Sequence, residues 1–111
     1  IATVYTVTTP AVTKTDAANK YDGTFSMEPS ATKGVNGSTI TLTLSWTADA
    51  DFASTANTTV KVTVTGTGAT VSNSGDVTIT PAQMKAGGSA TLTLTVGTAN
   101  VTANTAVTVA Q

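Results

Sequence analysis

The chain has 111 residues, which is enough for one domain with a single core and too short for two comfortable ones. Five Lys, no Arg and six acidic residues leave a net charge of −1, so the chain lacks the basic face that nucleic-acid binding needs and the basic amphipathic stretch of a membrane-surface protein. Cys and His are both absent, which excludes disulfides, thiolate metal sites and the commonest general base, so we expect no cofactor and no enzymatic activity.

The N-terminal segment 2–9, ATVYTVTT, predicts a weak strand. Val4 falls on the face opposite Tyr5 and Val7, so the strand has apolar side chains on both faces. A strand of that kind is expected at the edge of a sheet, or under a neighbouring module.

The next part of the chain is the least regular. Residues 12–24 form a polar loop that holds most of the local charge. The stretch TFSMEPSAT, residues 24–32, then predicts a short strand with Phe25 and Met27 pointing inward. Pro29 ends this strand, because proline has no N–H to give to a ladder.

Strict alternation of apolar residues with Thr or Ser is the strongest signal in the rest of the chain. Thr occupies 28 positions, and its β-branched side chain suits strands and can face water without charge. In the first run we expect Leu42 and Leu44 to be buried and Thr41 and Thr43 to be exposed. The inward positions of all five runs are Ile40, Leu42, Leu44 and Trp46; Val60, Val62 and Val64; Val77 and Ile79; Ala90, Leu92, Leu94 and Val96; and Val107 and Val109.

Turn signals separate these runs. Asn36 and Gly37 form a pair for which positive φ is cheap, and SNSGD, residues 72–76, predicts a compact turn. The glycines of TGTGAT, residues 65–70, predict a bulge or a bend. Residues 81–85 are compatible with a single helical turn. No window of eleven residues has a helical period, so we expect no long helix.

About seven strands joined by short turns predict an all-β fold, an antiparallel two-sheet sandwich of immunoglobulin-like type. There is no internal repeat and Thr is enriched throughout, so residues 1–111 are expected to form one domain. An odd number of strands, each reversing direction, predicts that the chain enters one pole of the sandwich and leaves at the other. Because the chain opens at Ile1 rather than Met, we expect a processed product or a module of a longer protein.

The stretch VTITPAQMKAGGSATLTLTV, residues 77–96, resembles the second half of many bacterial immunoglobulin-like and fibronectin-III-like modules. In those modules a strand ending at Pro leads through a Gly-rich turn to a strand of alternating small polar and apolar residues. The resemblance covers about residues 37–111, without the Cys pair of antibody-type domains. It implies a place in a tandem array of a secreted or cell-surface protein, as a spacer, adhesin segment, surface-layer part or enzyme appendage. Similar modules decorate phage virions.

Four acidic residues in loops are candidate calcium ligands, because calcium takes hard oxygens and loop Asp residues often supply them. They are Asp49 and Asp51 after the first alternating strand, and Asp16 and Asp22 in the N-terminal polar loop. Neither set matches the EF-hand loop. Asp also favours turns, where its side chain bonds nearby backbone N–H groups, and we favour that interpretation, with no metal bound.

Three aromatic residues are candidates for sugar stacking: Trp46, Tyr21 and Phe52. Flat aromatic faces are what carbohydrate modules use to hold sugar rings. Trp46, however, continues the inward register of Ile40, Leu42 and Leu44. With only five aromatic residues in the chain, the core needs several of them. We therefore favour a core position for Trp46.

A Lys–Asn crosslink assisted by a buried acid, as in some surface adhesins, is a further hypothesis. Solvated Lys side chains are the interpretation we favour, because Lys61 alternates with inward Val residues and should point outward. The groups that such a bond would use are Lys14, Lys20 or Lys61, with Asn100 or Asn104, beside Glu28 or Asp76.

The leading hypothesis is a non-catalytic structural or interaction module of a secreted or cell-surface protein, such as a spacer, stalk or adhesin segment. Its expected partners are neighbouring modules of the same polypeptide, or a cell-surface glycan or protein. It needs no nucleic acid and no membrane insertion. The alternatives are a carbohydrate-binding module attached to an exported enzyme and an immunoglobulin-like module of a phage virion. Two or more exposed aromatic residues in one plane would favour the carbohydrate-binding alternative, and buried ones would favour the structural module.

Overall fold

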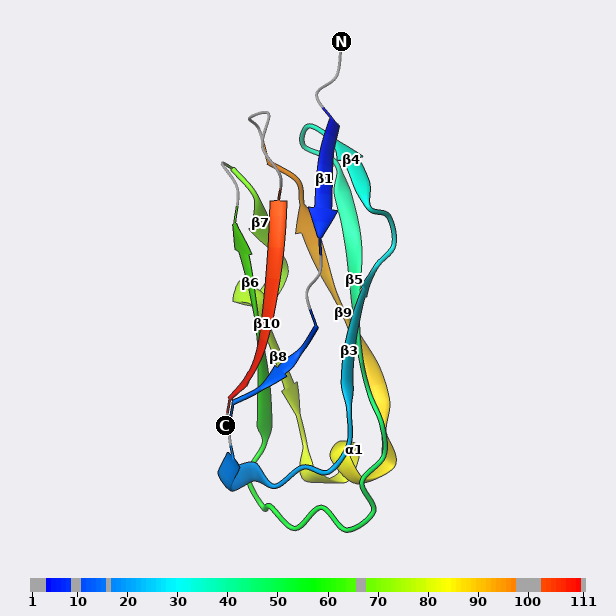
Figure 1. The fold of residues 1–111 in the computed structure, drawn as a ribbon, viewed down its shortest axis with the longest axis vertical. Helices are drawn as coiled ribbons and strands as arrows, with labels where there is room; N and C mark the ends of the chain where they lie inside the picture. Colours follow the sequence, from blue (N-terminus) through cyan, green and yellow to red (C-terminus); the bar gives the residue numbers. More distant parts are fainter. Residues whose placement is uncertain (1–3, 9–10, 16, 66–67, 98–102, 111) are drawn as a thin grey trace.

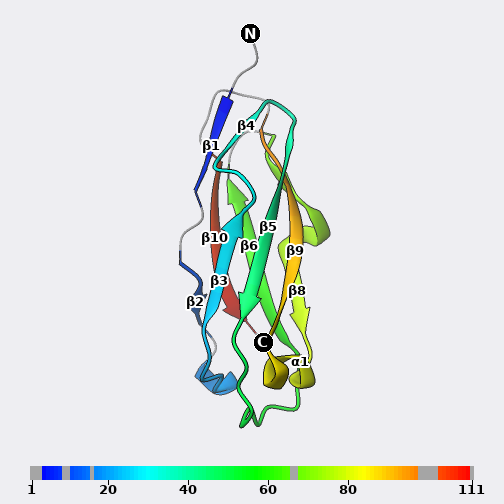
Figure 2. The same cartoon turned by 90° about the vertical axis from the view of Figure 1, so that its right-hand side faces the viewer.

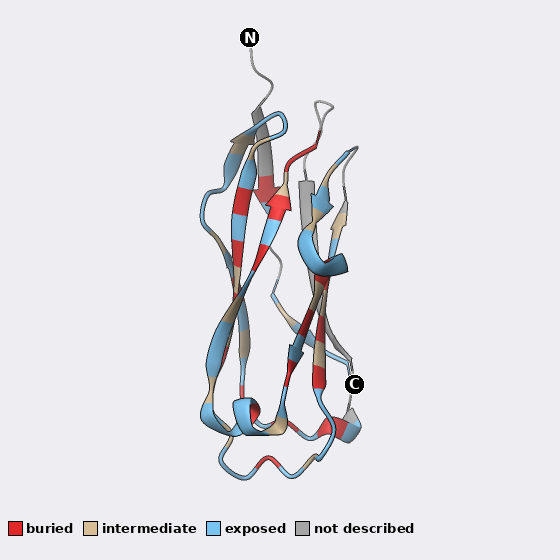
Figure 3. Cartoon of the chain, turned by 180° about the vertical axis from the view of Figure 1, so that it is seen from behind, coloured by how far each residue is buried: buried red, intermediate tan, exposed pale blue. Residues whose placement is uncertain are grey.

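The computed structural model describes residues 4–8, 11–15, 17–65, 68–97 and 103–110. Within these residues the chain forms ten strands, one α-helix and two short 3-10 helices (Figure 1). The strands make two sheets, one of which lies behind the other in Figure 2. Buried hydrophobic residues from both sheets form one core cluster, and Figure 3 marks the buried positions in red. The predicted all-β fold is confirmed. The structure has more strands than the seven expected, because three of the ten are only two or three residues long.

The larger sheet has the strand order β4-β1-β10-β6-β8, and β2 pairs with β10 beside β1. Its strands are β1 (Val4–Thr8), β2 (Thr13–Lys14), β4 (Lys33–Val35), β6 (Thr58–Thr65), β8 (Asp76–Ile79) and β10 (Ala103–Ala110). Of the two positions expected for the first strand, the sheet edge is wrong, since β1 lies between β4 and β10. Apolar residues on both faces of β1 misled that prediction, because the short strand β4 gave no signal of its own. Cover by a neighbouring module stays a prediction.

Two pairings in the larger sheet are parallel, which corrects the expectation of a purely antiparallel fold. β1 pairs with β10 through Val7 opposite Ala103 and Thr8 opposite Asn104. β2 continues along the same strand, with Thr13 opposite Thr108 and Lys14 opposite Val109. The first and last strands therefore run in the same direction. The other pairings among the described residues are antiparallel.

The smaller sheet has the order β3-β5-β9-β7 and is antiparallel throughout its described length. Its strands are β3 (Phe25–Pro29), β5 (Thr39–Trp46), β7 (Thr70–Val71) and β9 (Gly88–Thr95). The eight residues of β5 pair with β9 on one side, from Thr39 opposite Thr95 to Trp46 opposite Gly88. On the other side β5 pairs with β3. The predicted strand at 24–32 is confirmed, with Met27 buried and Phe25 half-buried.

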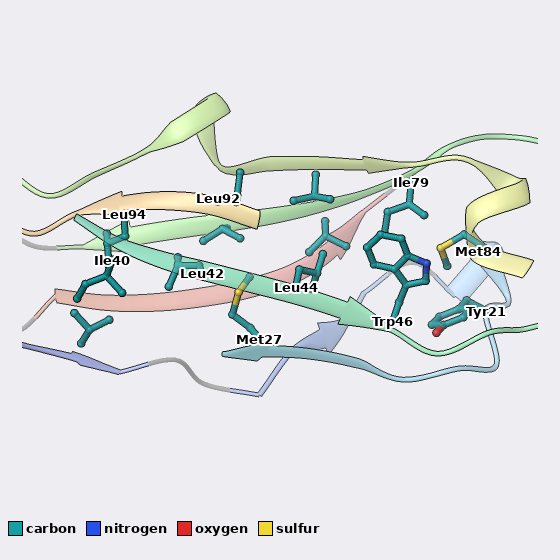
Figure 4. Packing of buried hydrophobic residues seen from close by; sticks show 14 of the residues in the cluster. Tyr21, Met27, Ile40, Leu42, Leu44, Trp46, Ile79, Met84, Leu92 and Leu94 are labelled. Carbon is teal, nitrogen blue, oxygen red and sulfur yellow. The ribbon is translucent and has the colours of Figure 1, made fainter. Parts of the chain in front are cut away.

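The core follows the alternation that the sequence predicts. Leu42 and Leu44 are fully buried, and Ile40 and Trp46 extend the same row along β5 (Figure 4). Thr41 is exposed as expected, but Thr43 is half-buried. The reason is its central position, with Thr91 of β9 opposite on one side and Glu28 of β3 on the other. The rest of the core consists of Val7, Tyr21, Met27, Phe52, Val60, Val62, Val77, Ile79, Met84, Leu92, Leu94 and Val96.

The predicted turns are largely confirmed. Gly37 has φ 75°, and Ser38 N donates to Val35 O at 3.0 Å across the Asn36-Gly37 turn. The 72–76 turn contains the 3-10 helix η2 (Ser72–Gly75). The bulge predicted in TGTGAT lies partly outside the described residues. The helical turn that residues 81–85 allowed corresponds to helix α1 (Pro81–Ala86).

Helix α1 begins with a capping box that the sequence analysis did not predict. Thr80 is the N-cap, and its Oγ1 accepts a hydrogen bond from Gln83 N at 3.2 Å. In return, Thr80 N donates to Gln83 Oε1 at 2.8 Å. The reciprocal bonds satisfy N–H groups that have no partner inside the helix, which allows so short a helix to form. No described helix has the length and apolar character needed to cross a membrane.

We call the end of the molecule that carries α1 and the 47–57 loop the α1 end, and the opposite end, with β4, the β4 end (Figure 1). The chain is about 52 Å long and 20 Å wide. β1 begins at the β4 end, where Val4 lies opposite Val35. β10 runs toward the α1 end, where Ala110 lies opposite Thr59 near the start of β6.

Candidate functional site

The α1 end holds the described residues among the predicted metal and sugar-stacking candidates. Three segments meet there: the stretch 17–24 with the 3-10 helix η1 (Ala17–Asn19), the loop 47–57 and helix α1 (Figure 1). Trp46 is the last residue of β5, and Tyr21, Asp49 and Phe52 come from the surrounding loops. The structure therefore brings together aromatic and acidic candidates that are far apart in the sequence.

Trp46 is a core residue that also anchors the helix. Its side chain is only 7% exposed and lies beside Met84 of α1 (Figure 4). Its Nε1 donates a hydrogen bond to Gln83 O at 2.9 Å. A buried indole needs a partner for its single N–H, and this helix carbonyl supplies one. The ring thus joins β5 to α1.

Tyr21 and Phe52 are buried in the same region, at 7% and 2% exposure. The Tyr21 hydroxyl donates to Thr47 O at 2.6 Å, which ties the 17–24 segment to the loop after β5. The Tyr21 ring centroid lies 4.9 Å from that of Phe25 and 6.3 Å from that of Phe52. These rings pack on one another instead of presenting a plane to solvent. Of the aromatic side chains described, only Phe25 is more than slightly exposed.

Asp49 stabilises the turn by accepting hydrogen bonds from backbone N–H groups. Its Oδ1 accepts from Asp51 N at 3.2 Å, and its Oδ2 accepts from Asp22 N at 3.1 Å in the neighbouring loop. Its own backbone N–H donates to Met84 O at 3.0 Å. The carboxylate thus links the 47–57 loop to the 17–24 segment, while the backbone links the loop to α1.

The other acidic candidates do not gather around Asp49 to form a cation site. Asp22 and Asp51 are exposed, and the contact each makes with the Asp49 carboxylate is through its backbone N–H. Asp16 lies outside the described residues. Within the part of the chain that the structure describes, no group of three or more acidic side chains is arranged to hold a metal ion.

A hollow of about 340 Å³ lies beside this cluster, open to solvent, between η1 and the loop at 53–55. Its one charged residue is Lys20, whose backbone has φ 54°. Its floor includes Asn19, a buried side chain whose Nδ2 donates to Thr58 Oγ1 at 2.8 Å. The lining offers hydroxyl, amide and ammonium groups. The lining residues are Ala18, Asn19, Lys20, Ala53, Ser54 and Thr55.

Sequence reasoning missed the Asn19–Thr58 hydrogen bond. These residues lie 39 positions apart in the chain, and each is an ordinary loop or strand residue in its own segment. No local pattern marks a side-chain pair that only the tertiary fold creates. The bond fixes η1 to the start of β6, and so closes another side of the α1 end.

Two of the three Lys residues proposed for a crosslink, Lys14 and Lys61, make other interactions. Lys14 Nζ donates to Gly23 O at 2.6 Å and to Tyr21 O at 3.1 Å. Lys61 forms an ion pair with Asp76 at 3.2 Å, on the outer side of the larger sheet.

The positions of the Asn residues give little support to the crosslink. Lys61 lies opposite Thr108 of β10, four residues along the strand from Asn104. Four residues of strand span roughly 13 Å, which is more than a Lys and an Asn side chain can bridge together. Lys20 and Glu28 are exposed, and Asn100 lies outside the described residues.

Comparison with protein-family models, with curated proteins and with solved structures gives no match for this chain.

Proposed function

We propose that the chain is a non-catalytic spacer or stalk module of a secreted or cell-surface protein, with an immunoglobulin-like β-sandwich fold. Its partners are the neighbouring modules of the same polypeptide. The surface location follows from the resemblance to bacterial immunoglobulin-like and fibronectin-III-like modules. The role as a spacer is argued from the path of the chain.

The observation that carries the proposal is the parallel direction of the first and last strands in an elongated body. β1 begins at the β4 end and β10 finishes near the α1 end. The longest dimension of the chain is 52 Å and the others are close to 20 Å. A module with this path lengthens a tandem array by nearly its own length, while a module whose two ends lie together adds little reach.

The α1 end gives this proposal further support. The polar groups of Trp46, Tyr21 and Asp49 there are hydrogen-bonded to backbone groups. A glycan-binding site needs a polar and aromatic surface that is accessible to the ligand. Buried rings at Trp46, Tyr21 and Phe52 favour the structural role over the carbohydrate-binding one.

The test is the length of a tandem array in solution. We expect small-angle X-ray scattering of one, two and three directly joined copies to show a maximum dimension that rises by about 50 Å per copy. The matched control has the same copies joined by long Gly/Ser linkers. Its dimension should grow more slowly with copy number, roughly as the square root, because such linkers are flexible coils.

Compact tandem arrays would contradict the proposal. If two and three joined copies fold back side by side, the maximum dimension would stay near that of one copy while the cross-section widened. The role as a spacer would also be removed if the maximum dimension of the directly joined copies grew no more steeply with copy number than that of the Gly/Ser control.

A further inference from the structure

The described residues 4–8 and 11–14 form a strap that runs along β10, and we propose that this strap bears tension applied through the two ends of the chain. The inference rests on the proposed function, because only a module joined at both ends is pulled in this way. It concerns which contacts bear the applied force and in which pulling direction the module resists unfolding most.

The direction of the strands decides how the load is shared. The strap runs parallel to β10 and is paired with it at both ends, through Val7 and Thr8 with β1 and through Thr13 and Lys14 with β2. In a tandem array the N-terminus is pulled outward at the β4 end of the molecule and the C-terminus is pulled outward at the α1 end. These opposite forces make the strap slide along β10. Every hydrogen bond between the two is then loaded at once. Antiparallel neighbours pulled at one shared end would instead separate one bond at a time.

The strap is anchored near the β4 end by a buried side chain and by the edge strand. Val7 is 2% exposed and belongs to the core. Its backbone N–H donates to Thr32 O at 2.8 Å, beside the three rungs between β1 and β4. Sliding the strap therefore requires that Val7 leave the core, which exposes apolar surface to water.

Lys14 anchors the other end of the strap to the smaller sheet. Its Nζ donates to Gly23 O and Tyr21 O, in the segment that leads into β3. The same ammonium lies 5.1 Å from the centroid of the Tyr21 ring, which is a cation–π distance. The strap is thereby attached to both sheets, since its backbone pairs with β10 and its last side chain binds the segment before β3. Val12, between the two anchors, is half-buried against the core.

The experiment compares two directions of pulling on the same fold by single-molecule force spectroscopy. In the first, force is applied through the two chain ends. In the second, it is applied through the C-terminal end and a cysteine in T15C, an exposed site just after the strap. The chain has no native Cys, so the attachment is unique. Both attachment points of the second geometry lie toward the α1 end, so β2 and β10 are separated there bond by bond.

We expect the unfolding force to be several-fold higher through the chain ends than through the T15C geometry. Forced unfolding reports the barrier to unfolding in the chosen direction, so equilibrium stability, which is the same in both geometries, does not account for the difference. Equal forces in the two directions would overturn the inference. Such a result would leave the scattering test of the spacer role unaffected, so the two failures are distinguishable.

A pair of Lys substitutions tests the anchor at the α1 end. K14M keeps the aliphatic length and removes the donors to Gly23 O and Tyr21 O. K85M makes the same change at an exposed Lys in the last turn of α1, away from the strap. We expect K14M to lower the force through the chain ends relative to K85M and to leave the T15C direction unchanged. If K14M and K85M give the same force through the chain ends, Lys14 is not part of the load path.

Discussion

Single side chains at the α1 end explain why residue types typical of ligand sites form a structural cluster here. Asp49, Trp46 and Tyr21 each use a polar group that a ligand could have occupied, and each group is bonded to backbone of a different segment. In sequence these residues look like a metal ligand and two sugar platforms. In the structure they hold the ends of three loops together, because a buried polar group requires a hydrogen-bond partner.

At this scale we predict that D49A destabilises the fold by about 1–2 kcal/mol, since two backbone N–H groups lose their acceptor. The matched control is D51A, which removes the same charge from an exposed residue and should cost less than ~0.5 kcal/mol. Urea unfolding with and without calcium measures both, and we expect calcium to change neither. Calcium-dependent stability of the native chain that both variants abolish would instead make Asp49 and Asp51 a cation site.

The turn between β7 and β8 is the clearest case of an element that the sequence predicts only in outline. SNSGD predicts a turn, and Asn73, Ser74 and Gly75 all have positive φ, a rare run of left-handed backbone. Asn73 Nδ2 donates to Asp76 O at 2.8 Å, and Lys61 Nζ donates to Ser74 O from the neighbouring strand. These bonds hold a conformation that most residues avoid, and the composition of the turn does not reveal it.

Two glycines with positive φ allow the cost of backbone strain to be measured separately from the cost of a steric clash. Gly75 has φ 77°, and a Cβ there would overlap the carbonyl oxygen of Val62 in β6. Gly37 has φ 75°, and a Cβ there would meet nothing within 4 Å. We expect G37A to cost about 1–2 kcal/mol, which is the strain alone. G75A should cost at least ~3 kcal/mol, because the β6 backbone must also move. Equal losses in urea unfolding would show that the Val62 carbonyl yields without cost.

Strongly alternating strands were predictable from sequence, while the pairing of the short ones was not. The alternation of Leu42 and Leu44 with Thr on β5 predicts a buried face, and it can be seen within that one segment of the sequence. β4, β2 and β7 have two or three residues each, too few for any period to show. The parallel pairing of Val7 with Ala103 joins residues from opposite ends of the chain, which no local pattern records. The same limit explains the site: residue types at Trp46 and Asp49 were visible, but their hydrogen-bond partners were not.

At the scale of the whole molecule, the path of the chain and its surface point to the same proposed role. The described strands agree with the expectation that the chain enters one end and leaves at the other, because β1 begins at the β4 end and β10 finishes near the α1 end. The reason differs from the expected one. The expectation followed from an odd number of strands that all reverse direction, whereas the structure places parallel first and last strands on one sheet. The outer face of β5 and β9 carries Thr and Ser in matched pairs, uncharged and polar.

We therefore predict that the isolated module binds no common polysaccharide, because its described aromatic rings are buried or half-buried. Pull-down on insoluble cellulose and chitin, together with a glycan array, measures this, and heat-denatured chain controls for adsorption of exposed apolar groups. Micromolar or tighter binding by the folded module alone would support the carbohydrate-binding alternative.

The pair formed by Lys61 and Asp76 has a consequence for the surroundings in which the module works. It is the single ion pair recorded among the described residues, and its side chains are 45% and 41% exposed. Exposed pairs contribute about 0–1 kcal/mol, and dissolved salt weakens even that contribution. Among the described residues, ion pairs therefore contribute little to the free energy of folding compared with apolar burial and backbone hydrogen bonds, which moderate salt does not weaken. A module built in this way keeps the same shape in fresh water and in brine, which suits the proposed place outside the cell.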